Sequence, residues 1–236
     1  PGDQDAFMTS LTVENYLKTA WQIAARQETE WVTTGQLATA LHVSPGTVTS
    51  MLKTLAESGL AEYRPYEGVC LTPQGKALAL RMLRRHRLIE LFLARTLQLN
   101  WDEVHEEAEH MEHAVSDFLV DRIDDFLGCP SHDPHGDPIP SSDGSMRGDA
   151  KQGTPLSSIA PGTPVRMTRV TNQGRDFLRF LTDAGMELGI EGVVRQNNPE
   201  AGIVVTEVAG KPVAIGLPAA EQILVEVLPE GGKQGG

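Results

Sequence analysis

The sequence contains few cysteines and no long apolar stretch. Only Cys70 and Cys129 occur among its 236 residues, which argues against a disulfide scaffold and fits a reducing compartment. No run of about 18 apolar residues is present, so no membrane-spanning helix is predicted, and no secretory apolar segment follows the start. We therefore expect a cytoplasmic protein that has no membrane partner.

Basic residues are also scarce, because 20 Lys and Arg stand against 32 Asp and Glu, which gives a net charge of −12. Residues 1–98 carry 10 basic against 9 acidic residues (+1), whereas residues 99–236 carry 10 against 23 (−13). A near-neutral region with local basic patches can bind phosphates, whereas the acidic remainder repels DNA unless cations bind to it. The charge distribution therefore permits a DNA-binding protein that depends on cations.

The densest set of potential metal ligands lies between residues 105 and 113. If this stretch is helical, His105, Glu109, Glu112 and His113 share one face of the helix. Two imidazoles and two carboxylates suit Mn²⁺, Fe²⁺, Co²⁺, Ni²⁺ or Zn²⁺ better than Cu(I), for which thiolates would be expected. For this stretch taken alone, a solvated acidic helix face is the more common alternative.

Two other groups of residues bear on the metal hypothesis. His86 and Glu90 lie four residues apart on an earlier predicted helix and offer a second pair of ligands from a facing element. Cys129, His132 and His135 resemble part of a zinc motif, but the intervening prolines and the lack of further close ligands favour a turn. The two helical ligand groups together favour a metal site over a solvated face.

The first part of the chain predicts a winged helix-turn-helix. Apolar residues recur at helical spacing in three segments, and a Pro-Tyr-Glu-Gly turn between two short β-prone runs predicts a hairpin. In such a fold the last of the three helices enters the major groove of DNA. The expected helices cover residues 11–26, 33–41 and 47–58, and the hairpin strands cover residues 61–64 and 69–71.

The outward face of the predicted recognition helix is rich in hydroxyl groups. Such a face offers contacts to phosphates and to thymine methyl groups, but no Arg, Asn or Gln for bidentate base readout. We therefore expect modest direct readout with a contribution from DNA shape, and the alternative is a winged helix used only for protein contact. The candidate DNA-binding residues are Ser44, Thr47, Thr49, Ser50, Lys53, Thr54 and Arg64.

Beyond this region the sequence predicts two longer helices, a linker and a small β module. The helices, residues 73–97 and 101–127, expose more apolar surface than one small domain can cover, which favours a symmetric homodimer. Residues 128–161 are rich in Pro, Gly, Ser and Asp and predict a linker that is ordered at most in about its first dozen residues. A barrel of the SH3 type is expected from five strands at residues 165–170, 192–195, 203–208, 212–215 and 223–227, with one helix at 174–184.

The expected fold class is mostly α with a small β domain. Residues 1–7 precede Met8, look like a remnant of an expression vector, and are excluded from the fold prediction. The remaining chain is expected to form an N-terminal winged helix-turn-helix DNA-binding domain at 8–78, a helical metal-binding and dimerisation domain at 79–140, a linker at 141–161 and a C-terminal SH3-like (FeoA-like) β-barrel at 162–236.

Three segments make the chain resemble a known family. Residues 14–19, 85–90 and 104–117 are similar to the diphtheria-toxin-repressor family of iron- and manganese-dependent transcriptional repressors, and the resemblance covers the chain from about Met8. The resemblance implies two metal sites per chain. The primary site would use the residues matching Asn15, Glu109, Glu112 and His113, and the ancillary site those matching His86, Glu90 and His105.

The chain departs from the family pattern at several of these positions. Iron-responsive members commonly have Cys at the position of Glu109 and Met at that of Asn15, so Glu109 resembles the manganese-responsive members. Asn15 is neutral, and it is either a carbonyl-oxygen ligand or no ligand. His105 is a feature of the iron type, which leaves Mn²⁺ against Fe²⁺ open. Gln173 or Asp176 in the β module are candidates to complete the ancillary site, but the alignment there gives no clean match.

The favoured function is that of a repressor, not an enzyme. The resemblance implies a homodimer that binds double-stranded operator DNA when Mn²⁺ or Fe²⁺ is bound, with Co²⁺, Ni²⁺, Zn²⁺ or Cd²⁺ as substitutes in vitro and no small organic substrate. One alternative is a winged-helix regulator that senses an organic ligand. The other is a metalloenzyme with Glu109 or Glu112 as general base, which the absence of a His-Glu-x-x-His pattern disfavours.

Overall fold

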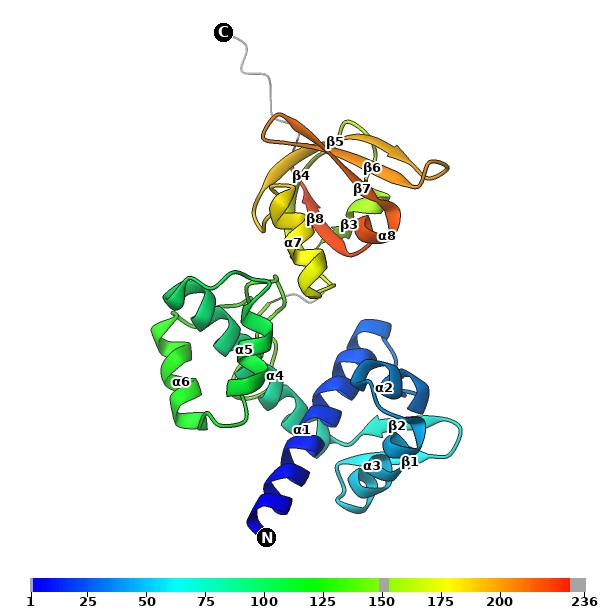
Figure 1. Ribbon diagram of the computed structural model, residues 1–236, viewed down its shortest axis with the longest axis vertical. Coiled ribbons are helices and arrows are strands. Elements are labelled where there is room, and N and C mark those ends of the chain that lie inside the picture. The colour runs from blue at the N-terminus through cyan, green and yellow to red at the C-terminus, as the bar shows by residue number, and fades with distance from the viewer. Residues whose placement is uncertain (1, 149–152, 230–236) are drawn as a thin grey trace. The chain divides into compact units, whose positions relative to one another are not determined.

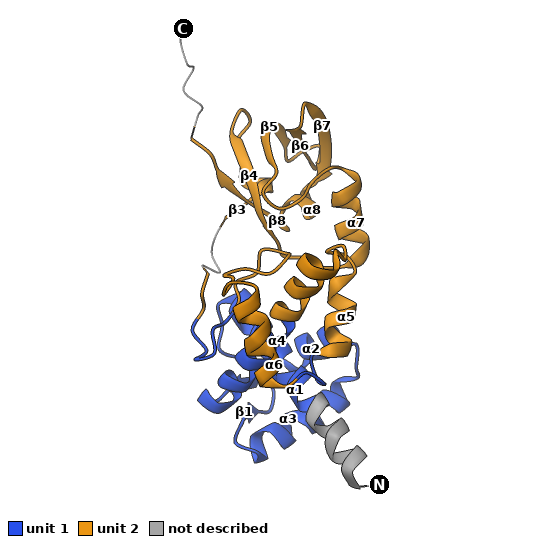
Figure 2. Cartoon of the chain, turned by 90° about the vertical axis from the view of Figure 1, so that its left-hand side faces the viewer, with its two compact units in different colours: residues 1–86, 112–115, 140–145 blue, residues 87–111, 116–139, 146–236 orange. Residues whose placement is uncertain are grey.

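The computed structural model describes residues 2–148 and 153–229, with the side chains of residues 2–11 left out (Figure 1). The chain divides into two compact units (Figure 2). Unit 1 consists of Pro1–His86, Glu112–Val115 and Pro140–Ser145, and unit 2 of Arg87–Met111, Ser116–Ile139 and Met146–Gly236. Among the helices of the described residues, none is long and apolar enough to cross a membrane.

Unit 1 contains the predicted winged helix-turn-helix. Its two strands pair as an antiparallel hairpin, and the apolar faces of the helices form one buried core around Leu17, Leu37 and Leu52. Its elements are α1 (Gly2–Gln27), α2 (Thr34–Leu41), α3 (Pro45–Glu57), β1 (Ala61–Arg64), β2 (Gly68–Leu71) and the first part of α4 (Pro73–Leu97).

The ends of the short helices follow from their capping residues. Thr33 caps α2 in a reciprocal capping box with Gln36, as its sequence position predicts. Ser44 caps α3 by accepting from the Thr47 amide, and Pro45 occupies the first turn, where a missing N–H costs nothing. Hence α3 begins at Pro45, whereas the sequence places a break there.

The two helices expected from residues 73 to 127 are only partly confirmed. α4 has the predicted bounds, but the single helix expected at residues 101–127 is wrong. Two shorter helices, α5 (Val104–Met111) and α6 (Asp117–Phe126), take its place. Ser116 is the N-cap of α6, and its hydroxyl accepts a hydrogen bond from the Leu119 amide at 3.3 Å. The residues between the helices, including Glu112 and His113, form a turn.

The C-terminal part of unit 2 is an open antiparallel sheet and not the closed barrel expected from the sequence. The five predicted strands are present, and a further strand of two residues extends one edge. The order is β3-β8-β4-β5-β6-β7, so β3 and β7 are edge strands. These strands are β3 (Thr154–Pro155), β4 (Pro164–Val170), β5 (Glu191–Asn198), β6 (Ile203–Val208), β7 (Lys211–Gly216) and β8 (Ile223–Val227), with helices α7 (Arg175–Asp183) and α8 (Leu217–Ala220).

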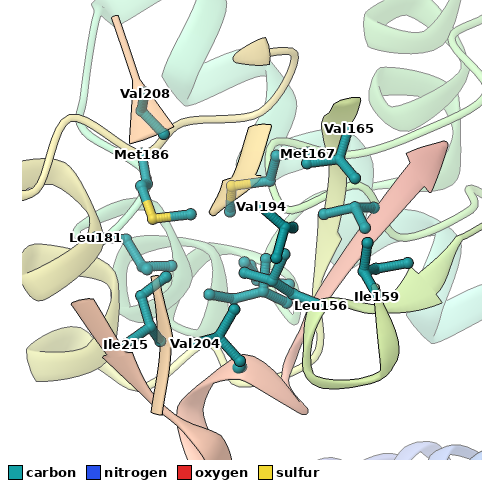
Figure 3. Close-up of a cluster of buried hydrophobic side chains, with 14 of the residues drawn as sticks. Leu156, Ile159, Val165, Met167, Leu181, Met186, Val194, Val204, Val208 and Ile215 are labelled. Atoms are coloured by element: carbon teal, nitrogen blue, oxygen red, sulfur yellow. The ribbon is translucent and has the colours of Figure 1, made fainter. Parts of the chain in front are cut away.

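The core of this sheet includes residues from the stretch expected to be a linker. Leu156, in a 3₁₀ turn of residues Leu156–Ser158, is fully buried, and Ile159 is nearly so. Figure 3 shows both side chains among Val165, Val194 and Val204 of the sheet. The β module therefore begins before residue 162.

Candidate metal centre

Glu112 is the centre of a buried polar cluster in unit 1. Its carboxylate is completely buried and accepts two short hydrogen bonds, from Lys18 Nζ at 2.7 Å and from His86 Nδ1 at 2.6 Å. Its backbone carbonyl accepts from Arg85 Nη1 at 3.0 Å, which satisfies an oxygen that lies beyond the end of α5. The turn between α5 and α6 is thus held by contacts with α1 and α4.

The surroundings of Glu112 keep its carboxylate ionised. Burial alone would raise the pKa of Glu112, but the hydrogen bond and charge of His86, together with the charge of Lys18, outweigh it and leave the pKa below its ordinary value. A deprotonated carboxylate is the form that binds a metal ion. Because a carboxylate only accepts hydrogen bonds, His86 presents its Nδ1–H to Glu112.

His113 adjoins this cluster, and Asn15 belongs to the same unit. His113 Nε2 lies 3.4 Å from Glu112 Oε1, and its Nδ1 lies 3.0 Å from Glu14 Oε2. Glu14 thereby orients the ring, as carboxylates commonly do for metal-ligating histidines. The side-chain amide oxygen of Asn15 is buried and makes no hydrogen bond, so its lone pairs can coordinate a metal ion. These imidazole and oxygen donors fit a divalent cation of the Mn²⁺ or Fe²⁺ class.

Unit 2 contains a second polar cluster, which begins at Glu90 on α4. This carboxylate is fully buried and lies 3.1 Å from His105 Nδ1 of α5, as the sequence predicts for two ligands of one site. Glu109 lies one turn after His105 on α5 and is half-buried. The sequence argument that His105, Glu109, Glu112 and His113 share one helix face is wrong, because α5 ends at Met111.

Two residues in the loop after α6, Asp133 and His135, complete a buried group with Glu90. The sequence analysis did not consider Asp133 and assigned His135 to a turn without metal. Asp133, His135 and Glu90 each place a ligand atom within 4.8 Å of the others. His135 Nε2 is 2.8 Å from the Trp101 carbonyl oxygen, to which it donates, so that Nδ1 carries the lone pair and faces Glu90 Oε2 at 3.8 Å. Nδ1 of His135 and Oδ2 of Asp133 make no hydrogen bond.

Burial and neighbouring carboxylates favour the protonated form of Asp133, although Arg87 Nε lies 3.6 Å from its Oδ2. Burial, followed by the charges of Asp137 and Glu90, raises the pKa of Asp133 to about 7. A bound cation would favour the ionised form of the same carboxylate. The only local sequence signal for this group was that two potential ligands, Asp133 and His135, lie two positions apart. Cys129, considered there as a partner of His135, is exposed.

The same turn is fixed to the β module through Asp137. Its carboxylate lies 3.2 Å from Arg87 Nη2 and 2.5 Å from Arg169 Nε of β4, and it accepts from Gln173 Nε2 at 3.0 Å. Gln173, a candidate ligand from the sequence, is thus used to hold the turn, and the other candidate, Asp176, is exposed on α7. A Cβ at Gly136 would clash with the Thr168 carbonyl oxygen, so the close approach to β4 requires glycine.

The candidate DNA-binding residues lie on the outer side of α3 and on the hairpin. Three of the hydroxyls bond back to the carbonyl oxygen four residues earlier, those of Thr49, Ser50 and Thr54. Arg64, on β1, bonds to Glu62 and Glu67 and lies 4.5 Å above the Trp31 ring. The other candidates, Ser44, Thr47 and Lys53, are exposed.

Comparisons with known proteins match all three parts of the chain. Residues 8–69 match the N-terminal DNA binding domain of iron dependent repressors, residues 72–141 their metal binding and dimerisation domain, and residues 154–227 the FeoA domain. The iron-dependent repressor IdeR of Mycobacterium tuberculosis (strain ATCC 25618 / H37Rv) is 31% identical over 219 residues, which cover 90% of this chain and 91% of that protein. The chain belongs to the diphtheria-toxin-repressor family.

Other members of the family are similar to this chain over most of its length. The diphtheria toxin repressor of Corynebacterium glutamicum is 29% identical over 83% of this chain and 87% of its own length. A solved manganese-dependent transcriptional repressor in complex with manganese is 38% identical, with a TM-score of 0.81, over 92% of this chain and all of that one. The resemblance noted from the sequence is confirmed, and these repressors are transcription regulators and not enzymes.

Proposed function

We propose that the protein is a metal-dependent transcriptional repressor that binds operator DNA as a homodimer when Mn²⁺ or Fe²⁺ is bound. The observation that carries this proposal is the buried, ionised Glu112 carboxylate, which lies with His86 and His113 in the same compact unit as the winged helix. A ligand set built on α1, α4 and the turn after α5 allows metal occupancy to bias the state of the DNA-binding helices.

The proposed ligands contain nitrogen and oxygen but no sulfur. A bound divalent cation would supply the positive charge that balances the clustered carboxylates, and hard oxygen donors favour Mn²⁺ or Fe²⁺. Solved relatives hold Mn²⁺, Zn²⁺ or Cd²⁺, which supports Zn²⁺ and Cd²⁺ as substitutes in vitro. Co²⁺ and Ni²⁺ accept the same nitrogen and oxygen donors and are proposed as further substitutes. The proposed primary ligands are Asn15, Glu109, Glu112 and His113, and the proposed ancillary ligands are His86, Glu90 and His105.

Asp133 and His135 offer a second set of partners for Glu90. Both are buried, both retain an atom without a hydrogen bond, and both belong to a turn anchored to the β module. We include them as ligands of a site in unit 2. Metal there would connect α4 to this turn and so stabilise the arrangement of the helical and β parts of that unit.

The proposed homodimer uses the exposed apolar side of α6. Phe118, Leu119 and Phe126 expose 76%, 47% and 68% of their surface, which is unusual for large apolar side chains grouped on one helix of ten residues. A second copy of the chain, placed about a twofold axis, would bury the same residues from both sides. Two recognition helices would then face the two halves of a palindromic operator.

The proposed contacts to DNA come from α3 and the hairpin. Ser44, the N-cap of α3, and Thr47 offer exposed hydroxyl groups to a phosphate, and Lys53 adds a positive charge to the same polar face. Because the partners are operator DNA and metal ions, we infer a cytoplasmic location without a small organic substrate.

The experiment that tests the proposal is an operator-binding titration with Mn²⁺, Fe²⁺, Co²⁺ and Zn²⁺ against chelator, with bound metal measured in parallel. We expect binding to tighten about 5–150-fold with metal, which corresponds to an ordinary allosteric coupling. His113→Ala should abolish the response, because it removes a proposed ligand. His110→Ala, which changes an exposed histidine near the end of α5, is the matched control and should retain the response.

Two results would contradict the proposal. One is equal operator affinity in chelator and in saturating metal. The other is a response to an added organic metabolite in protein that binds no stoichiometric metal, which would favour the alternative regulator.

A further inference from the structure

A lysine ammonium contacts the carboxylate of Glu112, one of the proposed metal ligands. Lys18 is 6% exposed, and its Nζ is 2.7 Å from Glu112 Oε1, the oxygen that also lies 3.4 Å from His113 Nε2. The ammonium group of Lys18 thus contacts the same Glu112 oxygen that lies near His113. All these contacts lie within unit 1.

The lysine balances the charge of the cluster in the metal-free protein. A buried carboxylate without a counter-charge is costly, and the ammonium supplies one at hydrogen-bond distance. The same ammonium opposes a divalent cation, because two positive charges would then share one carboxylate at close range in a poorly solvated site. Metal and lysine are therefore alternative counter-ions for Glu112.

We propose that Lys18 is a tethered cation that competes with the metal ion for Glu112 and so sets the metal concentration at which the protein responds. This inference rests on the proposed function, because it concerns the same site. Metal binding must break the Lys18–Glu112 contact and release the side chain of a residue on α1. The lysine thereby raises the threshold for each divalent metal by a similar factor, because the broken contact is the same for all of them.

The competing interpretation is that Lys18 holds α1 against the turn in both states. The two interpretations differ in a measurable way. If the contact exists only without metal, its loss weakens the metal-free fold and tightens metal binding by the same free energy. If it persists with metal bound, its loss weakens both forms and leaves the affinity unchanged.

The test compares Lys18→Leu, Lys18→Arg and wild type in Mn²⁺ titrations followed by electron paramagnetic resonance, without DNA. Leu provides no ligand atom and preserves helix propensity, whereas Arg retains the cation. Lys76→Leu, an exposed lysine in unit 1, controls for the change in net charge. Melting temperatures are measured in chelator and in saturating Mn²⁺.

We expect Lys18→Leu to lower the Kd for Mn²⁺ by about ten- to hundredfold, the range that one charge-assisted hydrogen bond supplies. Its melting temperature should fall in chelator but not in saturating Mn²⁺. Lys18→Arg and Lys76→Leu should keep the wild-type Kd. A Co²⁺ titration should show the same factor as Mn²⁺.

An unchanged Kd in Lys18→Leu, or equal destabilisation with and without metal, overturns the inference while leaving the proposed function intact. If Lys18→Leu does not fold, Lys18→Ala takes its place in the same comparison. Absence of both Mn²⁺ and Fe²⁺ binding in wild type and all variants overturns the proposed function, and this inference with it.

Discussion

The side chains around Glu112 are buried and bonded to one another, unlike those of a solvated helix face. Because Glu112 accepts from both Lys18 and His86 in a buried position, Glu112→Ala removes the acceptor of two groups at once. We expect the metal-free protein to lose about 3–5 kcal/mol of unfolding free energy, which is usual when one partner of a buried pair is removed. Urea unfolding in chelator measures this change.

The control for this substitution is Glu107→Ala on α5, where the side chain is exposed. It should change the unfolding free energy by less than about 0.5 kcal/mol. Similar values for the two variants would show that the buried cluster contributes little to stability.

Asp133 should make the stability of the metal-free protein depend on pH. Its pKa is raised from 3.8 to about 7 in the folded protein, so the fold retains a proton that the unfolded chain releases. The resulting stability is fully present below about pH 4 and is lost as the pH rises through about 7. Asp133→Asn cannot ionise and should be more stable than wild type in chelator above pH 7.

Melting temperatures between pH 5 and about 8, measured in chelator for both proteins, test this effect of Asp133. The wild-type curve should fall with pH relative to that of Asp133→Asn. Parallel curves would mean that Asp133 titrates in the same range in the folded and unfolded states.

At the level of elements, the break between α5 and α6 determines where the ligands lie. Ser116 begins α6 by accepting from the Leu119 amide, so Ser116→Ala should lower the unfolding free energy by about 1 kcal/mol. Ser50→Ala, inside α3, leaves no helix-end amide unsatisfied and should have almost no effect. Chemical unfolding of the two variants provides the comparison, and equal losses would argue against a capping role.

The same break shows how far the sequence could predict the site. Apolar periodicity and capping residues predicted α2, α4 and the hairpin, because those signals are local. Periodicity also ran through residues 101–127, but the helix stops at Met111, and the Glu112 carbonyl accepts from Arg85, which is 27 positions away in the chain. Contacts between distant residues leave no periodic signal.

The β module shows a similar division between what is local and what is not. Four of its five longer strands were predicted with nearly correct bounds, whereas β5, predicted at residues 192–195, extends from Glu191 to Asn198. β3 contains only two residues and is defined by its pairing with β8, so nothing in the local sequence marks it. Leu156 and Ile159 were placed in a linker because Pro, Gly and Ser surround them, yet both enter the core. Composition identified the turn-rich stretch but not its buried residues.

At the scale of the whole molecule, the β module should affect only part of the metal binding. A chain ending at Ser145 keeps unit 1 but loses the contacts of Arg169 with Asp137 and of the Val170 amide with the His135 carbonyl. We expect it to retain metal-dependent operator binding and to bind one metal ion fewer per chain, because the turn with Asp133 is no longer held. Atomic emission analysis of dialysed protein gives the stoichiometry. An unchanged metal content would show that the turn keeps its structure alone.

Unit 1 is assembled from three separate stretches of the chain, the last of which ends at Ser145. During translation, residues 1–86 leave the ribosome well before Glu112, on which Lys18 and His86 converge. Contacts between distant positions must wait for the intervening chain, so the DNA-binding part reaches its final state late in synthesis. A nascent repressor therefore passes through a period in which its winged helix has been translated but the carboxylate that joins α1 to α4 has not.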